Sequence, residues 1–510
     1  MTFLKNVQSK SRNLTNILNT TLYKKPYKEI FATKHDGLWK QTTTNELIAM
    51  SNACYEILGS RQLGIGDRVV YKGKNSVEWV AWNIATHAWG CSWVPLYSNQ
   101  SNEHLKFIIN DCEPKLIITD DVSSICTSGK IIMNNTINVE KHHYNKKIPV
   151  EICANIANII YTSGTTGNPK GVILTHENIL SNIESINHRF SCFQDMNLNT
   201  LNILPWAHIY GYTAELYYNL FNNNHISIST DRENFINEIK QVKPSVLYLV
   251  PRVLQLIKNK LSVFDNPFTK FIIPTLLKRI FGGNIITIFV GGASVDYDTK
   301  LFFKKNGITL CEGYGCSETS PMISVNHLND PRDESSIGKI MHNLNVIIDN
   351  KEILVSGPSV MKGYWNNKEA TNNALVKKNG KIYYRTGDSG EIKNGFLYYH
   401  GRISDNYKLN NGKFVDLKTI ENVVDKYIPD KYAIYGENKE YNIIITEHPF
   451  SVNDETIQNI NKNLDNHIHL KGNMLVPPGT FEQFYTPKMS LRRNPFFNHI
   501  KDLIEIHYKK

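Results

Sequence analysis

The sequence predicts an α/β protein, with a large layered α/β N-terminal domain closed by a small β-rich subdomain and followed by a small α+β C-terminal domain. Three observations predict this organisation. Strand-like and helix-like segments alternate between residues 60 and 400, short strands with turn residues begin at about residue 345, and Gly401-Arg402 opens a last stretch of about a hundred residues. The expected bounds are 1–28 for a basic N-terminal segment, 29–400 for the large domain and 401–510 for the C-terminal domain.

The first part of the alternation consists of apolar runs between turn residues. Asn75 or Ser76 can cap a helix that stops before Gly90. The expected elements here are a strand at 66–73, a helix at 76–89, a strand at 91–97, a helix at 104–112 and a strand at 115–120.

Later segments repeat this pattern and then become β-rich. The expected elements are strands at 156–161, 171–174, 245–250 and 286–294, and a helix at 252–261. Asn394-Gly395, between two strand-like runs, is a signal for a β-hairpin. The short strands from about residue 345 therefore predict the small unit that closes the large domain.

The composition, with 41% hydrophobic and 20% charged residues, is ordinary for a soluble globular protein. The net charge of +10 is scattered along the chain, which disfavours nucleic-acid binding and fits anionic substrates or an acidic membrane surface. The eight cysteines form no CxxC pair and have no metal-ligand spacing to histidines. This usage predicts reduced thiols in an intracellular protein.

The N-terminal residues 1–28 contain no acidic residue and place leucines and isoleucines close to helical spacing. Three interpretations fit this pattern: a mitochondrial transit peptide, an amphipathic helix on a membrane surface, and a helix packed on the domain. The expected location is the cytoplasm. Peripheral association with a membrane and import into mitochondria are the other interpretations. No run in the sequence reaches the length of a membrane span, because Gly90 and polar residues interrupt Val77–Tyr97.

The segment YTSGTTGNPKGVILTH at 161–176 lies between two strand-like runs. Its hydroxyl groups can donate hydrogen bonds, its glycines let backbone N–H groups approach an anion, and its lysine adds positive charge. It is not a P-loop, because Asn168-Pro169 separate the second glycine from the lysine. The residues expected to bind phosphate are Thr162, Ser163, Gly164, Thr165, Thr166, Gly167 and Lys170.

This segment resembles the signature loop of adenylate-forming enzymes, the superfamily of acyl-CoA synthetases, luciferases and peptide-synthetase adenylation domains. Other segments match the superfamily in its order, and the resemblance spans roughly residues 60–500. The matching segments are VGGASV (290–295), EGYGCSETSP (312–321), YYRTGDSG (383–390) and HGRISDNYKLNNGKF (400–414). The resemblance implies that residues 29–400 form an AMP-binding adenylation domain whose signature loop holds the β- and γ-phosphates of ATP.

The resemblance also implies individual ligands. Tyr314 would stack on adenine, and Asp388 would hold the ribose hydroxyls with help from Arg402. Glu318 would coordinate Mg²⁺, a hard cation that prefers carboxylate and phosphate oxygens. The implied ligands of ATP and coenzyme A are Gly292, Ala293, Tyr314, Gly315, Ser317, Asp388, Arg402 and Lys408. Asp405 corresponds to the superfamily's hinge, so the C-terminal domain is expected to be mobile.

Two segments, 202–221 and 243–257, look like long-chain fatty acyl-CoA synthetases. His208 is expected beside the phosphates as a catalytic residue. The neighbouring aromatic residues would line an acyl tunnel or, taken one by one, more often belong to the core. They are Trp206, Tyr210, Tyr212, Tyr217 and Tyr218.

The C-terminal stretch 485–497, YTPKMSLRRNPFF, departs from the superfamily, because Ser490 occupies the position of its catalytic lysine. On an extended segment Lys488 shares a face with Ser490 and could replace that lysine. A weakened first step and a basic segment without a chemical role are the other interpretations.

Together these features predict an ATP-dependent fatty acid–CoA ligase that forms acyl-AMP and then acyl-CoA, releasing pyrophosphate and AMP. Its substrates are ATP with Mg²⁺, coenzyme A and a medium- to long-chain fatty acid, and its expected catalytic residues are Lys170, His208, Glu318 and Lys488. One alternative is an adenylate-forming ligase with a carrier protein or an amine as acceptor. The other is a catalytically weakened protein that binds ATP or acyl-adenylate.

Overall fold

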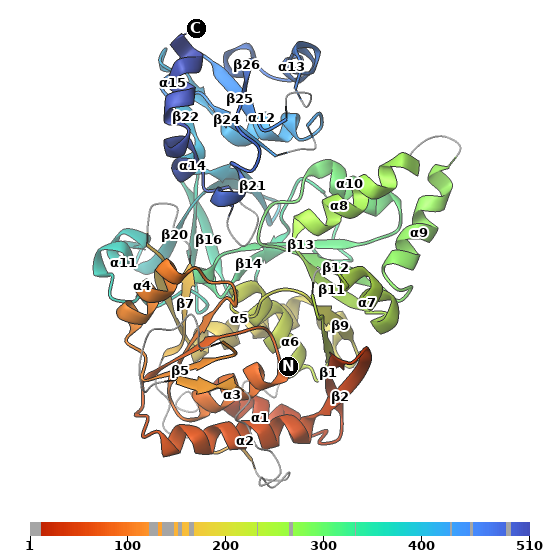
Figure 1. Cartoon of the computed structure of the whole chain (residues 1–510), viewed down its shortest axis with the longest axis vertical. Helices are drawn as coiled ribbons and strands as arrows, with labels where there is room; N and C mark the ends of the chain where they lie inside the picture. The colour runs from red at the N-terminus through yellow and green to blue at the C-terminus, as the bar shows by residue number, and fades with distance from the viewer. Residues whose placement is uncertain are drawn as a thin grey trace.

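The computed structural model describes residues 12–121, 131–134, 147–150, 156–162, 168–231, 233–264, 269–331, 333–428, 431–448, 452–485 and 491–509. Figure 1 shows a large α/β body with the smaller C-terminal part at one end. The predicted α/β fold class, with a large N-terminal and a smaller C-terminal domain, is therefore confirmed. The bounds between the domains and the mobility of the C-terminal one stay predictions.

The first large sheet has a parallel centre and two antiparallel strands on one side. In spatial order it runs β18 (Gly363–Tyr364), β8 (Lys170–Thr175), β7 (Ile156–Thr162), β4 (Ser92–Leu96), β3 (Arg68–Lys72), β5 (Leu116–Thr119) and β6 (Ile131–Met133). Its helices include α2 (Thr44–Ser60), α3 (Val77–Ala88), α4 (Asn102–Cys112) and α5 (His176–Arg189). The helices and strands predicted between residues 66 and 120 are all present, and Ser76 caps α3 by accepting a hydrogen bond from the Trp79 N–H.

The second large sheet is parallel at one end and antiparallel at the other. It runs β11 (Val246–Leu249), β12 (Thr287–Val290), β13 (Leu310–Gly315), β14 (Met322–Val325), β15 (Lys339–Ile340), β21 (Phe396–Arg402), β20 (Lys381–Lys393), β17 (Glu352–Ser356) and β16 (Asn345–Asp349), with β19 (Leu375–Lys378) on β20. Asn394 and Gly395 join β20 to β21 with φ angles of 52° and 79°. Both lie in the left-handed region of a tight hairpin turn, as predicted.

A smaller sheet, whose strand β9 contacts β11 of the second large sheet, runs β2 (Leu38–Thr43), β1 (Glu29–His35), β10 (His225–Ile228) and β9 (Asn199–Asn202). A π-helix, η4 (Tyr210–Tyr217), continues into α6 (Tyr218–Phe221). The remaining helices of the large body are α7 (Phe235–Val242), α8 (Pro251–Leu261), α9 (Ile273–Ile280), α10 (Tyr297–Lys305) and α11 (Lys368–Ala374).

The N-terminal helix α1 (Leu14–Leu22) packs inside the large body, against α3 and α6. Leu14, Leu18 and Leu22 are fully buried, and Arg12 forms ion pairs with Glu177 and Glu184 of α5. Of the three interpretations of this segment, packing on the domain is the one that fits α1, because its apolar side chains already lie in the protein core. None of the described helices combines the length and apolar character that a bilayer span needs.

The C-terminal part has hydrophobic cores built from residues between Tyr407 and Tyr508. Its strands are β22 (Tyr407–Lys408), β23 (Phe414–Val415), β24 (Tyr432–Tyr435), β25 (Asn442–Thr446) and β26 (Leu470–Leu475). Its helices are α12 (Leu417–Val424), α13 (Asp454–Asn461), α14 (Arg493–His499) and α15 (Lys501–Lys509). In Figure 1 this part lies above the C-terminal end of β21, so residues 403–406 connect the two bodies.

Candidate functional site

The predicted phosphate loop connects the antiparallel strands β7 and β8, where Thr162 pairs with Lys170. Ser163, Gly164, Thr165, Thr166 and Gly167 lie outside the described residues, so their role stays a prediction. The Lys170 ammonium lies 5.5 Å from the centre of the Tyr364 ring. The loop's lysine is therefore held at the base of the hairpin by an aromatic face.

Tyr364 also reaches the residue predicted to hold magnesium, because its hydroxyl donates a hydrogen bond of 2.8 Å to Glu318 Oε1. Burial and the nearby carboxylate of Glu318 raise the pKa of Tyr364, which keeps the phenol protonated as a donor. Tyr364 thus joins Lys170 and Glu318, which are far apart in sequence. Sequence reasoning missed Tyr364. The preceding residue, Gly363, has a φ of 151°, and a glycine at this point of the sequence is the one signal of a special backbone position there.

The segment carrying Glu318 turns sharply between β13 and β14. A Cβ atom at Gly315 would lie 1.8 Å from the Pro321 carbonyl oxygen, so glycine is required there. Ser317 is buried in the short 3₁₀ helix Ser317–Thr319, and the Glu318 carbonyl accepts a hydrogen bond from the Met361 N–H. This turn fixes the backbone beneath the Glu318 carboxylate.

Three of the predicted nucleotide ligands meet at one carboxylate. Asp388 of β20 lies directly opposite Arg402 of β21, and Arg402 Nε is 3.1 Å from Asp388 Oδ1. The Tyr314 hydroxyl donates a hydrogen bond of 2.6 Å to Asp388 Oδ2. Arg402 also donates to the Thr386 carbonyl at 2.9 Å, which orients its guanidinium. We call Tyr314, Asp388 and Arg402 the carboxylate cluster.

Burial and the charge pair of Asp388 with Arg402 together set the electrostatics of the carboxylate cluster. Burial raises the pKa of Asp388 to about 6, although the charge of Arg402 and the hydrogen bond from Tyr314 oppose the rise. Burial lowers the pKa of Arg402, but the charge of Asp388 outweighs it and raises that pKa overall. At neutral pH the cluster therefore holds a buried carboxylate with a permanently charged partner.

The predicted adenine-binding turn follows β12. Gly292 has a φ of 86°, and Gly292 and Ala293 are exposed. The turn is anchored two residues after Ala293, because the Val295 N–H donates a hydrogen bond of 2.9 Å to the buried Glu312 carboxylate, which also pairs with Lys300. Glu312 escaped sequence reasoning, which gave the EGYG segment a role through Tyr314 and Gly315.

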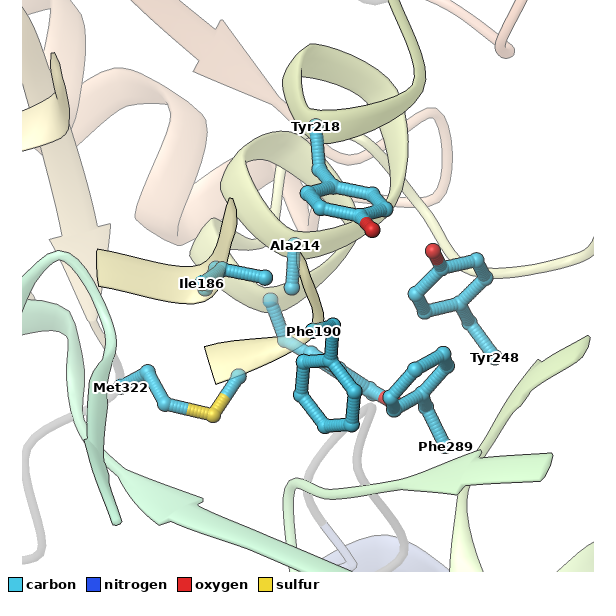
Figure 2. Close-up of a pocket in the computed structure, with 8 residues that line it drawn as sticks. Ile186, Phe190, Ala214, Tyr218, Tyr248, Phe289 and Met322 are labelled. Carbon is cyan, nitrogen blue, oxygen red and sulfur yellow. The ribbon is translucent and has the colours of Figure 1, made fainter. Parts of the chain in front are cut away.

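An apolar cavity lies beside this turn, lined by side chains from α5, η4, α6, β11, β12 and β14 (Figure 2). Its lining residues are Ile186, Phe190, Tyr210, Ala214, Tyr218, Tyr248, Phe289 and Met322. The space open to the centre of a water molecule is about 10 Å³, close to the minimum for one water. Tyr248 and Phe289 stack at 5.1 Å between ring centres and close one side.

The cavity and the nucleotide turn share a wall. A Cβ atom at Gly291 would lie 3.3 Å from the Tyr210 ring, so the ring packs directly against the turn's backbone. Of the aromatic residues expected near a tunnel, Tyr210 and Tyr218 line the cavity. Trp206, Tyr212 and Tyr217 are fully buried and are not among the lining residues, so the core interpretation fits them.

His208 lies just before η4 and is half-buried. Its Nδ1 accepts a hydrogen bond of 3.1 Å from the Tyr210 N–H, so the imidazole caps the start of the π-helix that carries two cavity residues. This contact ties His208 to the cavity wall, and a catalytic role beside the phosphates stays a prediction.

The predicted hinge and tail approach each other through one arginine. Arg493 at the start of α14 pairs with Glu421 of α12, and its Nε lies 3.9 Å from Asp405 Oδ2. Lys408 is exposed on β22. Lys488 and Ser490 lie outside the described residues, although the flanking Tyr485 and Leu491 form an antiparallel bridge.

Among the described residues, no group of three or more His, Cys, Asp or Glu side chains could hold a metal ion. Glu318 offers a carboxylate close to the ring that Lys170 contacts, with Oε1 engaged by Tyr364. A single carboxylate fits a cation whose other ligands are phosphate and water oxygens, which is the way Mg²⁺ is bound in many nucleotide sites.

Comparisons with known proteins place this geometry in a family. The family described as AMP-binding enzyme matches residues 19–365. A long-chain-fatty-acid–CoA ligase of Mycobacterium bovis, FadD15, is 26% identical over 475 residues, which cover 80% of this chain and 77% of the relative. A D-alanine–D-alanyl carrier protein ligase of Lactococcus lactis is 27% identical over 395 residues, covering 74% and 76% of the two chains. ATP-bound MatB from Rhodopseudomonas palustris has the same fold, with a TM-score of 0.80, 21% identity, and coverage of 96% of this chain and 99% of that one.

Proposed function

The chain belongs to the AMP-binding enzyme family, and we propose that it is an ATP-dependent fatty acid–CoA ligase. The observation that carries the proposal is the shared wall between the nucleotide turn and the apolar cavity, where Tyr210 packs against Gly291. An acid whose acyl group enters the cavity would have its carboxylate at the nucleotide side. Such an arrangement suits the joining of an apolar acid to AMP.

In the first half-reaction, a carboxylate oxygen of the acid attacks the α-phosphorus of ATP, and the bond to the pyrophosphate oxygen breaks. Asp388 would accept hydrogen bonds from the ribose hydroxyls, while Arg402 keeps that carboxylate oriented. Lys170 would neutralise phosphate charge from the base of the hairpin. Glu318 would hold Mg²⁺, which neutralises charge on the phosphates when it is bound.

In the second half-reaction, the thiol of coenzyme A attacks the acyl carbon, AMP leaves with the carboxylate oxygen, and a thioester forms. The acyl-adenylate is a better acylating agent than the free acid because AMP is a good leaving group. Asp405, in the segment that connects the two bodies, and Lys408, just beyond it on β22, would serve this step. The protein contributes charge and position rather than a covalent nucleophile.

A fatty acid is the favoured substrate because the cavity lining offers apolar carbon and aromatic rings, and because relatives such as FadD15 carry that activity in their names. Since the cavity admits about one water as it stands, an acyl chain must displace side chains to enter. A carrier protein as acceptor is the second candidate, and the D-alanyl carrier protein ligase relative favours it. The third candidate, a catalytically weakened protein that binds ATP or acyl-adenylate, is supported by Ser490, which occupies the position of the superfamily's catalytic lysine.

One assay separates these proposals. Purified protein is incubated with ATP, Mg²⁺ and acids of two to twenty carbons, and pyrophosphate is scored with and without coenzyme A. A ligase using coenzyme A releases pyrophosphate in an acid-dependent way and accumulates acyl-CoA. Acid-dependent pyrophosphate release that coenzyme A does not increase, without formation of acyl-CoA, would point to another acceptor. No pyrophosphate release with any acid would point to a catalytically weakened protein.

A further inference from the structure

The hydroxyl of Tyr210 is buried in the cavity wall without a hydrogen-bond partner. Tyr210 is 7% exposed, and among the described residues nothing donates to or accepts from its hydroxyl oxygen. The ring belongs to an apolar core cluster with Tyr248, Phe289 and Met322. An unpartnered hydroxyl in such surroundings costs free energy that a phenylalanine of the same shape would not cost. This hydroxyl is therefore a candidate for contact with a bound molecule.

The hydroxyl end of the Tyr210 ring lies at the nucleotide turn. A Cβ atom at Gly291 would lie 3.3 Å from Cζ, the ring carbon that carries the hydroxyl, and 3.4 and 3.5 Å from the two adjacent ring carbons. Gly291 is buried, whereas residues 292–294 directly after it are exposed. The hydroxyl thus lies where the buried cavity wall ends and the open turn begins.

The backbone that carries Tyr210 is held on both sides. Its N–H donates a hydrogen bond of 3.1 Å to His208 Nδ1. The next residue, Gly211, packs so closely that a Cβ atom there would lie 2.7 Å from the Pro205 carbonyl oxygen. Tyr210 also begins the π-helix η4, and π-helical turns often occur at functional sites. The start of the side chain is therefore fixed relative to the turn.

The Tyr210 hydroxyl is a donor at neutral pH. Burial raises the pKa of Tyr210, and the nearby Glu215 carboxyl and Cys311 thiol act in the same direction. Burial also raises the pKa of Glu215, which favours its uncharged form and so reduces repulsion of an anion. The matching ligand atom is an acceptor oxygen, and an anionic oxygen makes the stronger hydrogen bond.

We propose that the Tyr210 hydroxyl donates a hydrogen bond to a carboxylate oxygen of the acid substrate and so holds that carboxylate at the nucleotide turn. This inference rests on the proposed function, because it takes the cavity as the place of the acyl group. With the acyl group against the apolar lining, the carboxylate lies at the end where Tyr210 meets Gly291. Tyr210 would then select an acid over another apolar molecule of the same length.

The other anionic oxygen that could reach this turn belongs to a phosphate of ATP. The acid is favoured because the Tyr210 ring lines the cavity. The test must therefore measure the affinity for the acid and the affinity for the nucleotide separately.

The test is equilibrium binding of acids of two to twenty carbons to the full chain with the α,β-methylene analogue of ATP present. This analogue fills the nucleotide side and cannot release pyrophosphate, so binding is measured without turnover. Tyr210→Phe removes only the hydroxyl and should weaken binding of the acid by about tenfold or more. Its affinity for the analogue should stay within about twofold of the wild type. The alcohol of the same chain length should lose less than about threefold, because a neutral oxygen is the weaker acceptor.

Tyr217→Phe is the matched control, because it removes a hydroxyl from another tyrosine of η4. Tyr217 is fully buried outside the cavity lining, and its hydroxyl donates a hydrogen bond of 2.6 Å to Asn83 Oδ1. Tyr217→Phe should lower the Tm and keep the affinity for the acid. Tyr210→Phe should show the opposite pattern, with a Tm equal to or above that of the wild type, because the free protein loses no hydrogen bond.

Four results would overturn the proposal. They are equal affinity of Tyr210→Phe and the wild type for the acid, equal losses for the acid and the alcohol, a loss confined to the ATP analogue, and a wild type that binds none of the acids. Failure of the proposed function is a different result. A wild type that binds an acid but releases no pyrophosphate with ATP is not a ligase, and a tenfold loss in Tyr210→Phe would still assign the hydroxyl to the carboxylate.

Discussion

The nucleotide side of the candidate site and the apolar cavity beside it are built in different ways. The carboxylate cluster is polar, and two of its three members lie opposite each other on adjacent strands. The cavity is lined by eight side chains, which come from six separate elements and from Phe190 just after α5. The nucleotide side therefore depends on short segments whose side chains the strand pairing places together, whereas the cavity depends on how distant segments pack.

The largest effect is expected on the nucleotide side. Glu318→Gln keeps the size and the hydrogen bond to Tyr364 but removes the charge, so pyrophosphate release should fall by about a hundredfold or more, on the order of 3 kcal/mol. Tyr364→Phe is the control, because it keeps the ring beneath Lys170 and loses only the hydroxyl, and should cost less. A Glu318→Gln protein with near wild-type release would remove Glu318 from the reaction.

The next effect concerns the tail. If Lys488 replaces the lysine missing at Ser490, Lys488→Ala should lower adenylation by about tenfold or more, a barrier change of at least about 1.4 kcal/mol, because charge in the transition state loses its partner. Transfer from supplied acyl-adenylate to coenzyme A should survive. Ser490→Lys should rescue Lys488→Ala and add little to the wild type.

Two outcomes contradict this account of the tail. Undiminished adenylation by Lys488→Ala leaves Arg492 as the next candidate. A large gain from Ser490→Lys alone would mean that the natural chain is a weakened enzyme.

Asp388 predicts a pH dependence. With a pKa of about 6, roughly a tenth of Asp388 is ionised at pH 5 and nine-tenths at pH 7, so apparent ATP affinity should rise by up to about ninefold across that range. The folded pKa lies above the ordinary value of 3.8, so the folded state binds the proton more tightly and stability should fall as pH rises from about 4 to 6. Asp388→Asn should flatten both profiles when ATP binding and thermal unfolding are measured. A sloped profile in that variant would assign the titration to another group.

The smallest effect is expected in the cavity. Phe289→Ala opens the side closed by the stacked ring pair, so the preferred acid should become longer by several carbons, with a selectivity change of severalfold. Loss of a buried ring also costs stability, about 3 kcal/mol. Phe303→Ala, a fully buried ring in another core cluster, should cost similar stability without changing the preferred acid. The readout is pyrophosphate release over the acid panel.

Sequence reasoning succeeded where local signals decide structure. The helices and strands between residues 66 and 120 were predicted correctly, because each apolar run has either a helical or a strand-like pattern and ends at turn residues. Asn394-Gly395 gave the right hairpin because both residues accept left-handed backbone angles. Tyr314, Asp388 and Arg402 were named from motifs, and the structure brings them together.

The remaining features depend on tertiary packing. Phe289 and Tyr248 line the cavity, yet in the sequence they are ordinary apolar members of strands. Trp206 belongs to the same aromatic segment as Tyr210 but faces the core, and composition cannot separate the two. The leucines of α1 show the same ambiguity, because helical spacing of apolar residues suits a membrane surface and a protein interior equally.

The central claim is that the acid is activated as an acyl-adenylate, and an isotope measurement tests it most directly. A fatty acid labelled with oxygen-18 in its carboxylate is incubated with the protein, ATP, Mg²⁺ and coenzyme A, and the nucleotide products are examined by mass spectrometry. Attack on the α-phosphorus followed by thiolysis predicts one labelled oxygen in AMP for each acyl-CoA formed. Unlabelled AMP, or label in inorganic phosphate together with ADP, would contradict the account.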